Sequence, residues 1–157
     1  MKKLSLLYIL IILVLFSCSK NLPMTGPMTL EFDNRIEDHP GFTITYDITD
    51  IKLKRDDGLV FRNIEHHHVD ASDESSQEIE LNDLSSGGYV EVTFIVENIN
   101  VSSDFEYKSD SPATVTLAMP RTPVRAEHQP EVHLIFNIDQ LSAGIQSAFV
   151  VDHVHEN

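Results

Sequence analysis

Residues 88–96 read Gly-Tyr-Val-Glu-Val-Thr-Phe-Ile-Val and carry the strongest structural signal in the chain. Val90, Val92, Phe94 and Val96 stand at every second position of this stretch. Successive side chains of a β-strand point to opposite faces, so this spacing predicts a strand with one buried face. We expect these four side chains to lie in the core of the protein.

The same alternation extends outward on both sides of this stretch. Residues 42–48, Phe-Thr-Ile-Thr-Tyr-Asp-Ile, place four apolar side chains on one face, and the phase then slips near Thr49 and Asp50. This slip predicts a β-bulge. Asp57-Gly58 predicts a hairpin turn because glycine tolerates a positive φ angle. Further strands are predicted over residues 28–32, 59–64, 79–81, 115–119, 132–138 and 145–154.

The fold class follows from the number and length of these strands. No segment shows the period of an amphipathic helix, and no internal repeat is present. Residues 98–112 predict a loop, Pro120 predicts the end of a strand, and residues 139–144 can form one helical turn. Seven to nine short strands separated by turns predict an all-β fold, an antiparallel β-sandwich with immunoglobulin-like Greek-key connections. A closed barrel is the alternative.

The N-terminal segment indicates export and lipid attachment. Lys2 and Lys3 precede an apolar run over residues 4–16, as in a secretory signal peptide. The run is shorter than the roughly 20 residues of a membrane-spanning helix. Residues 15–18, Leu-Phe-Ser-Cys, resemble a bacterial lipobox, which predicts cleavage before Cys18 and lipidation of its sulfur. An ordinary signal peptide and an uncleaved anchor are the alternatives.

These signals define the expected organisation of the chain. Residues 1–17 are the predicted lipoprotein signal peptide, residues 18–27 a lipidated cysteine with a tether, and residues 28–157 a single β-sandwich domain. We expect the lipid anchor to hold the protein on a membrane of the cell envelope. Ser19 stands where an inner-membrane retention signal often carries aspartate, which favours the bacterial outer membrane and leaves its leaflet open.

Acidic residues dominate the charge of the chain. The sequence has 25 Asp and Glu against 11 Lys and Arg, which gives a formal net charge of −14. Such a surface repels nucleic acid, so no nucleic-acid partner is expected. It is compatible with cation binding, with a protein partner in the envelope, or simply with solubility outside the cell. Cys18 is the only cysteine, so the fold must be stable without an internal disulfide.

The sequence shows no constellation of catalytic residues. It contains no G-x-S-x-G elbow, no P-loop and no G-x-G-x-x-G fingerprint. Close carboxylate pairs arise by chance in so acidic a chain, so they do not identify a glycosidase dyad. We therefore expect a protein that is not an enzyme.

Histidines gather in three places and predict a metal site. The first group is His66-His67-His68, the second is His133 with nearby His128, and the third is His153 with His155. Residues i and i+2 of a strand share a face, so two imidazoles of one strand can face one ion. Imidazole suits copper, zinc and nickel. The predicted ligands, for copper or zinc, are His66, His67, His68, His133, His153 and His155, and we expect residues 66–68 to approach one of the other groups.

Other interpretations of these polar residues remain open. The histidines can be solvated side chains at strand ends, or they can sense pH because histidine titrates near neutrality. The acidic stretch over residues 70–78 offers oxygen ligands for Ca²⁺ but lacks the regular spacing of an EF-hand. A solvated run of charges is therefore the favoured interpretation of that stretch.

A series of short motifs runs from residue 30 to residue 139. It comprises residues 30–35 (Leu-Glu-Phe-Asp-Asn-Arg), the strand at 51–53, the Asp57-Gly58 turn, residues 67–70 (His-His-Val-Asp), residues 88–94 and residues 131–139. Their order resembles that of the MbnP-like family, secreted copper-associated β-sandwich proteins that are often lipoproteins. The resemblance implies the same fold, a role with copper and a ligand role for His67. The family's copper site also uses an oxidised tryptophan, whereas this sequence has no tryptophan.

Together these features predict a lipid-anchored envelope protein that acts as a binding module, with copper or another transition metal held by histidines. The alternative is a structural or adhesive surface module that contacts protein or glycan without a metal. A metal-binding protein should bring histidines of separate segments together in the fold. An adhesive module should leave them scattered and expose an apolar or aromatic patch.

Overall fold

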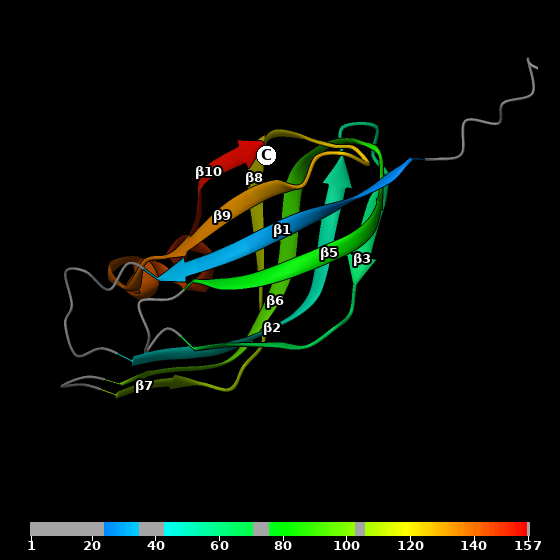
Figure 1. The fold of residues 1–157 in the computed structure, drawn as a ribbon. Helices are drawn as coiled ribbons and strands as arrows, with labels where there is room; N and C mark the ends of the chain where they lie inside the picture. Colours follow the sequence, from blue (N-terminus) through cyan, green and yellow to red (C-terminus); the bar gives the residue numbers. More distant parts are fainter. Residues whose placement is uncertain (1–23, 35–42, 71–75, 103–105, 157) are drawn as a thin grey trace, which may run out of the picture.

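The computed structural model describes residues 24–34, 43–70, 76–102 and 106–156. Cys18, the predicted signal peptide and most of the predicted tether lie outside the described residues. The described residues form ten strands, more than the seven to nine predicted, and two short helices, and the strands belong to two sheets. Figure 1 shows the sheets as two layers that are not closed into a barrel, which confirms the predicted all-β sandwich.

The first sheet has four strands. They are β1 (Thr25–Asn34), β5 (Gln77–Ser85), β9 (Pro130–Phe136) and β10 (Phe149–Glu156), in the order β10-β9-β1-β5. Strand β1 pairs antiparallel with β5 but parallel with β9, and β10 pairs antiparallel with β9. The purely antiparallel arrangement that the sequence predicted is therefore wrong for one pair of strands. Strand β10 forms one edge of this sheet and β5 the other.

The second sheet is built around two long strands, β2 (Thr43–Arg55) and β6 (Gly87–Ser102), which pair with each other. On the outer side of β2, β4 (His67–Asp70) and β3 (Val60–Asn63) pair with successive parts of the strand. On the outer side of β6, β8 (Ala113–Val124) and β7 (Glu106–Ser109) do the same.

The two short helices connect β9 to β10 in the first sheet. The 3₁₀ helix η1 (Ile138–Ala143) lies where one helical turn was predicted, and its first turn is capped by the Asn137 side chain. Helix α2 (Ile145–Ala148) follows it directly. The last strand therefore begins at Phe149, four residues later than the alternation predicted.

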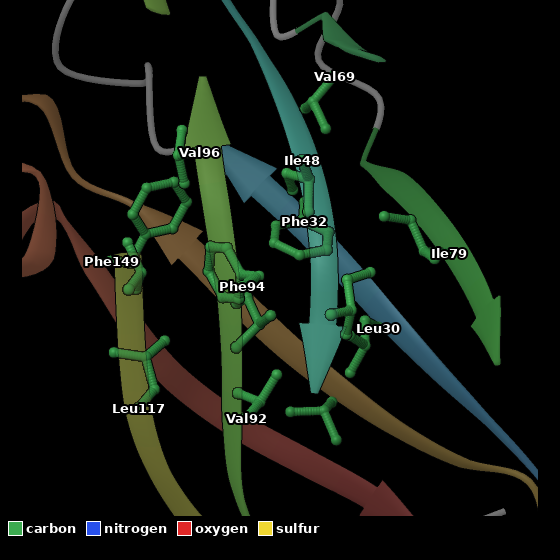
Figure 2. Packing of buried hydrophobic residues seen from close by; sticks show 14 of the residues in the cluster. Leu30, Phe32, Ile48, Val69, Ile79, Val92, Phe94, Val96, Leu117 and Phe149 are labelled. Atoms are coloured by element: carbon green, nitrogen blue, oxygen red, sulfur yellow. The ribbon is translucent and has the colours of Figure 1, made fainter. Parts of the chain in front are cut away.

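The core lies between the two sheets and is formed by their inward faces. Figure 2 shows Leu30 and Phe32 of β1 packed with residues of β2, β6 and β8. The ring of Phe94 makes edge contacts with Phe32 at 5.5 Å and with Phe149 at 5.3 Å between centroids. Such aromatic contacts add to the hydrophobic gain of burial. They tie β6 of one sheet to β1 and β10 of the other.

The strongest predicted strand is correct in three of its four core positions. Val92, Phe94 and Val96 are fully buried. Val90 is only half-buried, and its neighbour Tyr89 takes the inward position instead. The pairing of β6 with β8 shifts register between Tyr89 and Glu91, and such a bulge reverses which residues face the core.

Bulges allow the long strands to continue past polar residues. The predicted slip near Thr49 is confirmed, since the register shifts there and Asp50 has a φ of 51°. Asn98 has a φ of 52° at a similar irregularity in β6. Asp and Asn tolerate this left-handed backbone better than other non-glycine residues. The predicted Asp57-Gly58 turn is also confirmed, with Gly58 at a φ of 88°.

Three further boundaries differ from the prediction. The predicted loop at 98–112 is wrong, because β6 continues to Ser102 and β7 follows at 106–109. Pro120 does not end β8, since it lies where β8 bulges against β6, and a bulge tolerates proline. Strand β1 begins at Thr25, so residues 25–27 belong to the sheet rather than to a tether.

Candidate metal site

Strands β9 and β10 bring three histidines onto the outer face of the first sheet. In β9, Val132 and Leu134 point into the core, so His133 between them points outward. In β10, His153 stands opposite His133, and His155 follows two residues later on the same face. The structure thus joins the second and third histidine groups of the sequence.

A β-bulge sets the register that makes this meeting possible. Val151 pairs with Leu134, yet His153 rather than Asp152 pairs with His133, because the register shifts between Val151 and His153. In a regular ladder Asp152 would stand opposite His133, and His153 would turn to the inner face. The extra residue therefore places His153 beside His133.

The three imidazole rings lie in mutual contact. The rings of His133 and His153 are stacked, with centroids 3.9 Å apart and an angle of 15° between the planes. The ring of His155 meets both of them edge to face, at 5.3 Å from His133 and 4.6 Å from His153. Each residue offers a ligand nitrogen, and these atoms all lie within 4.8 Å of one another. The group can hold one metal ion.

The donor geometry fits an imidazole-bound ion after a small adjustment. Ligation at about 2.0–2.1 Å with tetrahedral angles places ring centroids roughly 5 Å apart. The two contacts of His155 already approach this separation. The stacked rings of His133 and His153 must open by about 1 Å so that both lone pairs reach the ion. In addition, Nε2 of His133 is buried and has no hydrogen-bond partner among the described residues.

Two carboxylates each contact Nδ1 of one of these rings. Glu31 of β1 stands beside His133 in the parallel pairing with β9, and its Oε2 lies 2.6 Å from Nδ1 of His133. Asp152 places its Oδ2 2.7 Å from Nδ1 of His153. Metal-bound histidines commonly donate their second ring N–H to a carboxylate in this way. The sequence analysis missed both carboxylates, although alternation alone places Glu31 on the outer face of its strand.

The charge of the first sheet favours a cation. Its four strands contain no lysine and no arginine. The lysines and arginines that lie within strands belong to the second sheet. A surface of one sign raises the local concentration of ions of the opposite sign. The acidic residues of the first sheet's strands are Glu31, Asp33, Glu78, Glu80, Asp83, Glu131, Asp152 and Glu156.

The 66–68 group lies on the other sheet and gathers around Asp47 of β2. Nδ1 of His68 is 2.7 Å from Oδ1 of Asp47, and Nε2 of His66 is 3.5 Å from Oδ2. The side-chain amide of Asn98 donates to the same Oδ2 at 2.6 Å. Burial of Asp47 opposes its ionisation, but the hydrogen bonds from Asn98 and His68 and the nearby charge of His66 hold its pKa below the usual range.

His67 points to the opposite side of β4 from His68. Its Nε2 is buried and has no hydrogen-bond partner among the described residues. Burial is the main cause that lowers the pKa of His67, and the charge of Glu65 acts against it. A ring in this setting is neutral at physiological pH.

The expected approach of residues 66–68 to the other histidines is not found. Among the described residues, the group that can hold a metal contains His133, His153 and His155 alone. Outward-facing residues of two packed sheets are separated by the core, which is about 10 Å thick between the sheets. His66 and His68 face outward on the second sheet, beside Asp47, so they cannot reach the outer face of the first. The acidic stretch considered for Ca²⁺ falls largely outside the described residues.

Comparisons with known proteins add no relative. No family model, curated protein or solved structure matches this chain. Among the described residues, neither short helix has the length and apolar character needed to cross a membrane.

Proposed function

We propose that this protein binds one divalent transition-metal ion through His133, His153 and His155. Two observations carry the proposal: the three residues offer ligand nitrogens that all lie within 4.8 Å of one another, and Nε2 of His133 is buried with no hydrogen-bond partner among the described residues. A buried polar atom without a partner is costly and rare in native proteins. A metal ion would satisfy it together with both neighbouring rings.

Copper and zinc are the proposed ions. Three imidazoles form a nitrogen set that suits Cu(II) and Zn(II), and affinity within such a set peaks at Cu(II). The resemblance to a copper-associated family supports copper, although the absence of tryptophan separates this ligand set from that of the family. Three protein ligands also leave one coordination position for water or an external ligand.

The proposed place of action is the cell envelope, with the domain held on a membrane by lipidated Cys18. The signal-like segment and lipobox support this proposal. A lipid-anchored domain with a negative first sheet would hold metal ions close to the membrane surface. The proposed role is binding, and His153 and His155 are exposed to solvent on the outer face of the sheet, where an ion from solution can reach them.

Calorimetric titration tests the proposal. The full chain is purified in detergent without a histidine tag and titrated with Zn²⁺ and, separately, Cu²⁺ near neutral pH. We expect one ion per chain with a dissociation constant in the micromolar range or below, and a loss of at least tenfold in affinity for His133→Ala. The paired control is the double variant His66→Ala and His68→Ala, which should bind as the wild type does. Equal loss in both variants, or binding weaker than millimolar, contradicts the proposal.

A second candidate function, contact with an envelope protein or glycan, is supported by the edge at β3. Leu59, Val60 and Ile64 expose apolar side chains there, with Ile64 at 75% exposure. Clustered exposed apolar residues often mark interaction sites. Replacing all three with serine should reduce binding to intact envelope fragments and leave Zn²⁺ affinity unchanged. Unchanged envelope binding removes this candidate.

A further inference from the structure

We infer that Glu31 is a positioning residue of the metal site. It acts on the ion through His133, whose imidazole it holds in one orientation and one tautomer. The inference rests on the proposed metal-binding function. It assigns a role in that function to a residue of β1, a strand that contributes no metal ligand.

The contact between Glu31 and His133 is short and shielded. Oε2 of Glu31 lies 2.6 Å from Nδ1 of His133, and each side chain is only 17% exposed. A neutral imidazole carries one proton, and a carboxylate can only accept a hydrogen bond. The proton therefore sits on Nδ1, which leaves the lone pair on Nε2. This Nε2 is the buried atom that has no hydrogen-bond partner.

The strand pairing fixes this geometry. Six consecutive residues of β1 pair with β9, from Thr29 with Glu131 to Asn34 with Phe136, and Glu31 stands beside His133 within this ladder. Strand β1 also pairs with β5 on its other side, so it is held along both edges. A carboxylate on a strand held in this way keeps the imidazole in place better than a residue on a loop.

The position of Glu31 is unfavourable for the sheet itself. On its other side it stands opposite Glu78 of β5, and like charges directly opposite in a sheet are destabilising. The four strands of the sheet supply no lysine or arginine to offset the pair. The contact with His133 is the interaction that offsets this repulsion, so the glutamate and the histidine that it orients depend on each other.

Asp152 makes the equivalent contact with His153 but allows a less clear test. It precedes His153 directly in sequence and is the extra residue of the β-bulge. A substitution at Asp152 would change the backbone and the hydrogen bond together. Glu31 and His133 lie on different strands, far apart in the sequence. A substitution at Glu31 can therefore remove the hydrogen bond without changing the backbone next to the histidine.

The experiment compares Glu31→Gln with Glu78→Gln in the full chain purified in detergent. Both variants remove one negative charge from neighbouring positions on the same face, but only Glu31 contacts a histidine of the site. Loss of such a supporting carboxylate lowers metal affinity about 10–100-fold. We expect a loss of this size in Zn²⁺ affinity for Glu31→Gln and a change below about threefold for Glu78→Gln.

A spectroscopic measurement separates orientation from folding. In ¹⁵N NMR of the metal-free wild type, His133 should show a protonated Nδ1 and a bare Nε2, and Glu31→Gln should shift this balance. Equal affinity losses in the two variants, or a wild-type His133 with its proton on Nε2, would overturn the inference. A wild type that binds no Zn²⁺ at all would contradict the proposed function itself. A wild type that binds Zn²⁺ while the two variants behave alike would contradict only the role of Glu31.

Discussion

At the scale of single residues, Asp47 is a carboxylate of the second sheet that contacts three other side chains. It is 8% exposed and interacts with His66, His68 and Asn98, which come from the segment at β4 and from β6. Hydrogen bonds to a charged group contribute about 1.5–3 kcal/mol each in typical proteins. The carboxylate therefore stabilises the contact of the short strand β4 with β2.

We expect Asp47→Asn to lower the free energy of unfolding by about 1–3 kcal/mol at pH 7, because Asn98 and His68 contact different oxygens of Asp47 and an amide keeps only one oxygen to accept from them. The measurement is urea unfolding followed by circular dichroism. Glu106→Gln is the control, since Glu106 is exposed on β7, and a surface change of this kind stays within about 0.5 kcal/mol. Equal effects of the two variants would show that Asp47 has no special role.

The same residue predicts a dependence of stability on pH. The pKa of Asp47 is lower in the folded protein than its ordinary value of 3.8. Its contribution to stability is therefore complete above pH 3.8 and is lost as the pH falls through the lower folded pKa. We expect the wild type to lose more stability than Asp47→Asn between pH 5 and pH 2. Parallel curves for the two proteins would contradict this prediction.

At the scale of elements, β10 carries two of the three candidate ligands and forms an edge of its sheet. It is held along one side by β9, and its pairing includes a bulge. Edge strands open more readily than central ones, so their amides exchange faster with solvent. An ion bound by β9 and β10 together would add a cross-link between the two strands.

We expect Zn²⁺ to slow hydrogen exchange of amides in residues 149–156, because a ligand that binds only the closed strand stabilises it. The opposite edge strand β5, at residues 77–85, belongs to the same sheet and carries no candidate ligand, so its exchange should not change. Hydrogen-exchange mass spectrometry compares both strands in one experiment. Slower exchange in both strands alike would indicate general stabilisation rather than a cross-link at β10.

Alternation along the sequence predicted the strands and the faces they bury, but not how the strands pair. Val92 and Phe94 are in the core because a period of two requires one inward face. The parallel pairing of β1 with β9 depends on contacts about 100 residues apart, so alternation could not predict that Glu31 would meet His133. Alternation could not predict the β-bulge at Asp152 either. Without this bulge, His153 could not be placed on the outer face of the first sheet.

The histidine groups illustrate the same limit. Composition and spacing predicted that residues 66–68 meet another histidine group, whereas in the structure His133 meets His153 and His155. The sequence could not show which sheet each group would join. Because His66 and His68 belong to the other sheet, the expected partnership of residues 66–68 with these rings is replaced by contacts with Asp47.

At the scale of the whole molecule, the two sheets differ in charge and in the candidate sites that they carry. The first sheet carries the three histidines and only acidic charges in its strands, whereas the second carries the basic residues and the exposed apolar edge at β3. The proposed lipid anchor would hold both surfaces near a membrane. Because the two candidate sites lie on different sheets, substitutions at the histidines and at the apolar edge of β3 can be tested separately.

We expect Cys18→Ala to abolish lipidation, because the thiol is the proposed attachment point for the lipid. The variant should appear in the soluble fraction or remain unprocessed with its signal segment. Membrane fractionation and intact-mass spectrometry give the answer. A variant with unchanged membrane attachment and unchanged mass would rule out the proposed anchor.

The most direct test of the central claim is a crystal structure of the zinc-loaded protein with anomalous diffraction recorded at the zinc absorption edge. We predict one strong anomalous peak on the outer face of the first sheet, about 2.0–2.1 Å from nitrogens of His133, His153 and His155. The ring of His133 should bind through Nε2 while its Nδ1 keeps the contact with Glu31. A peak at His66 and His68 instead, or no ordered ion at His133, would contradict the claim.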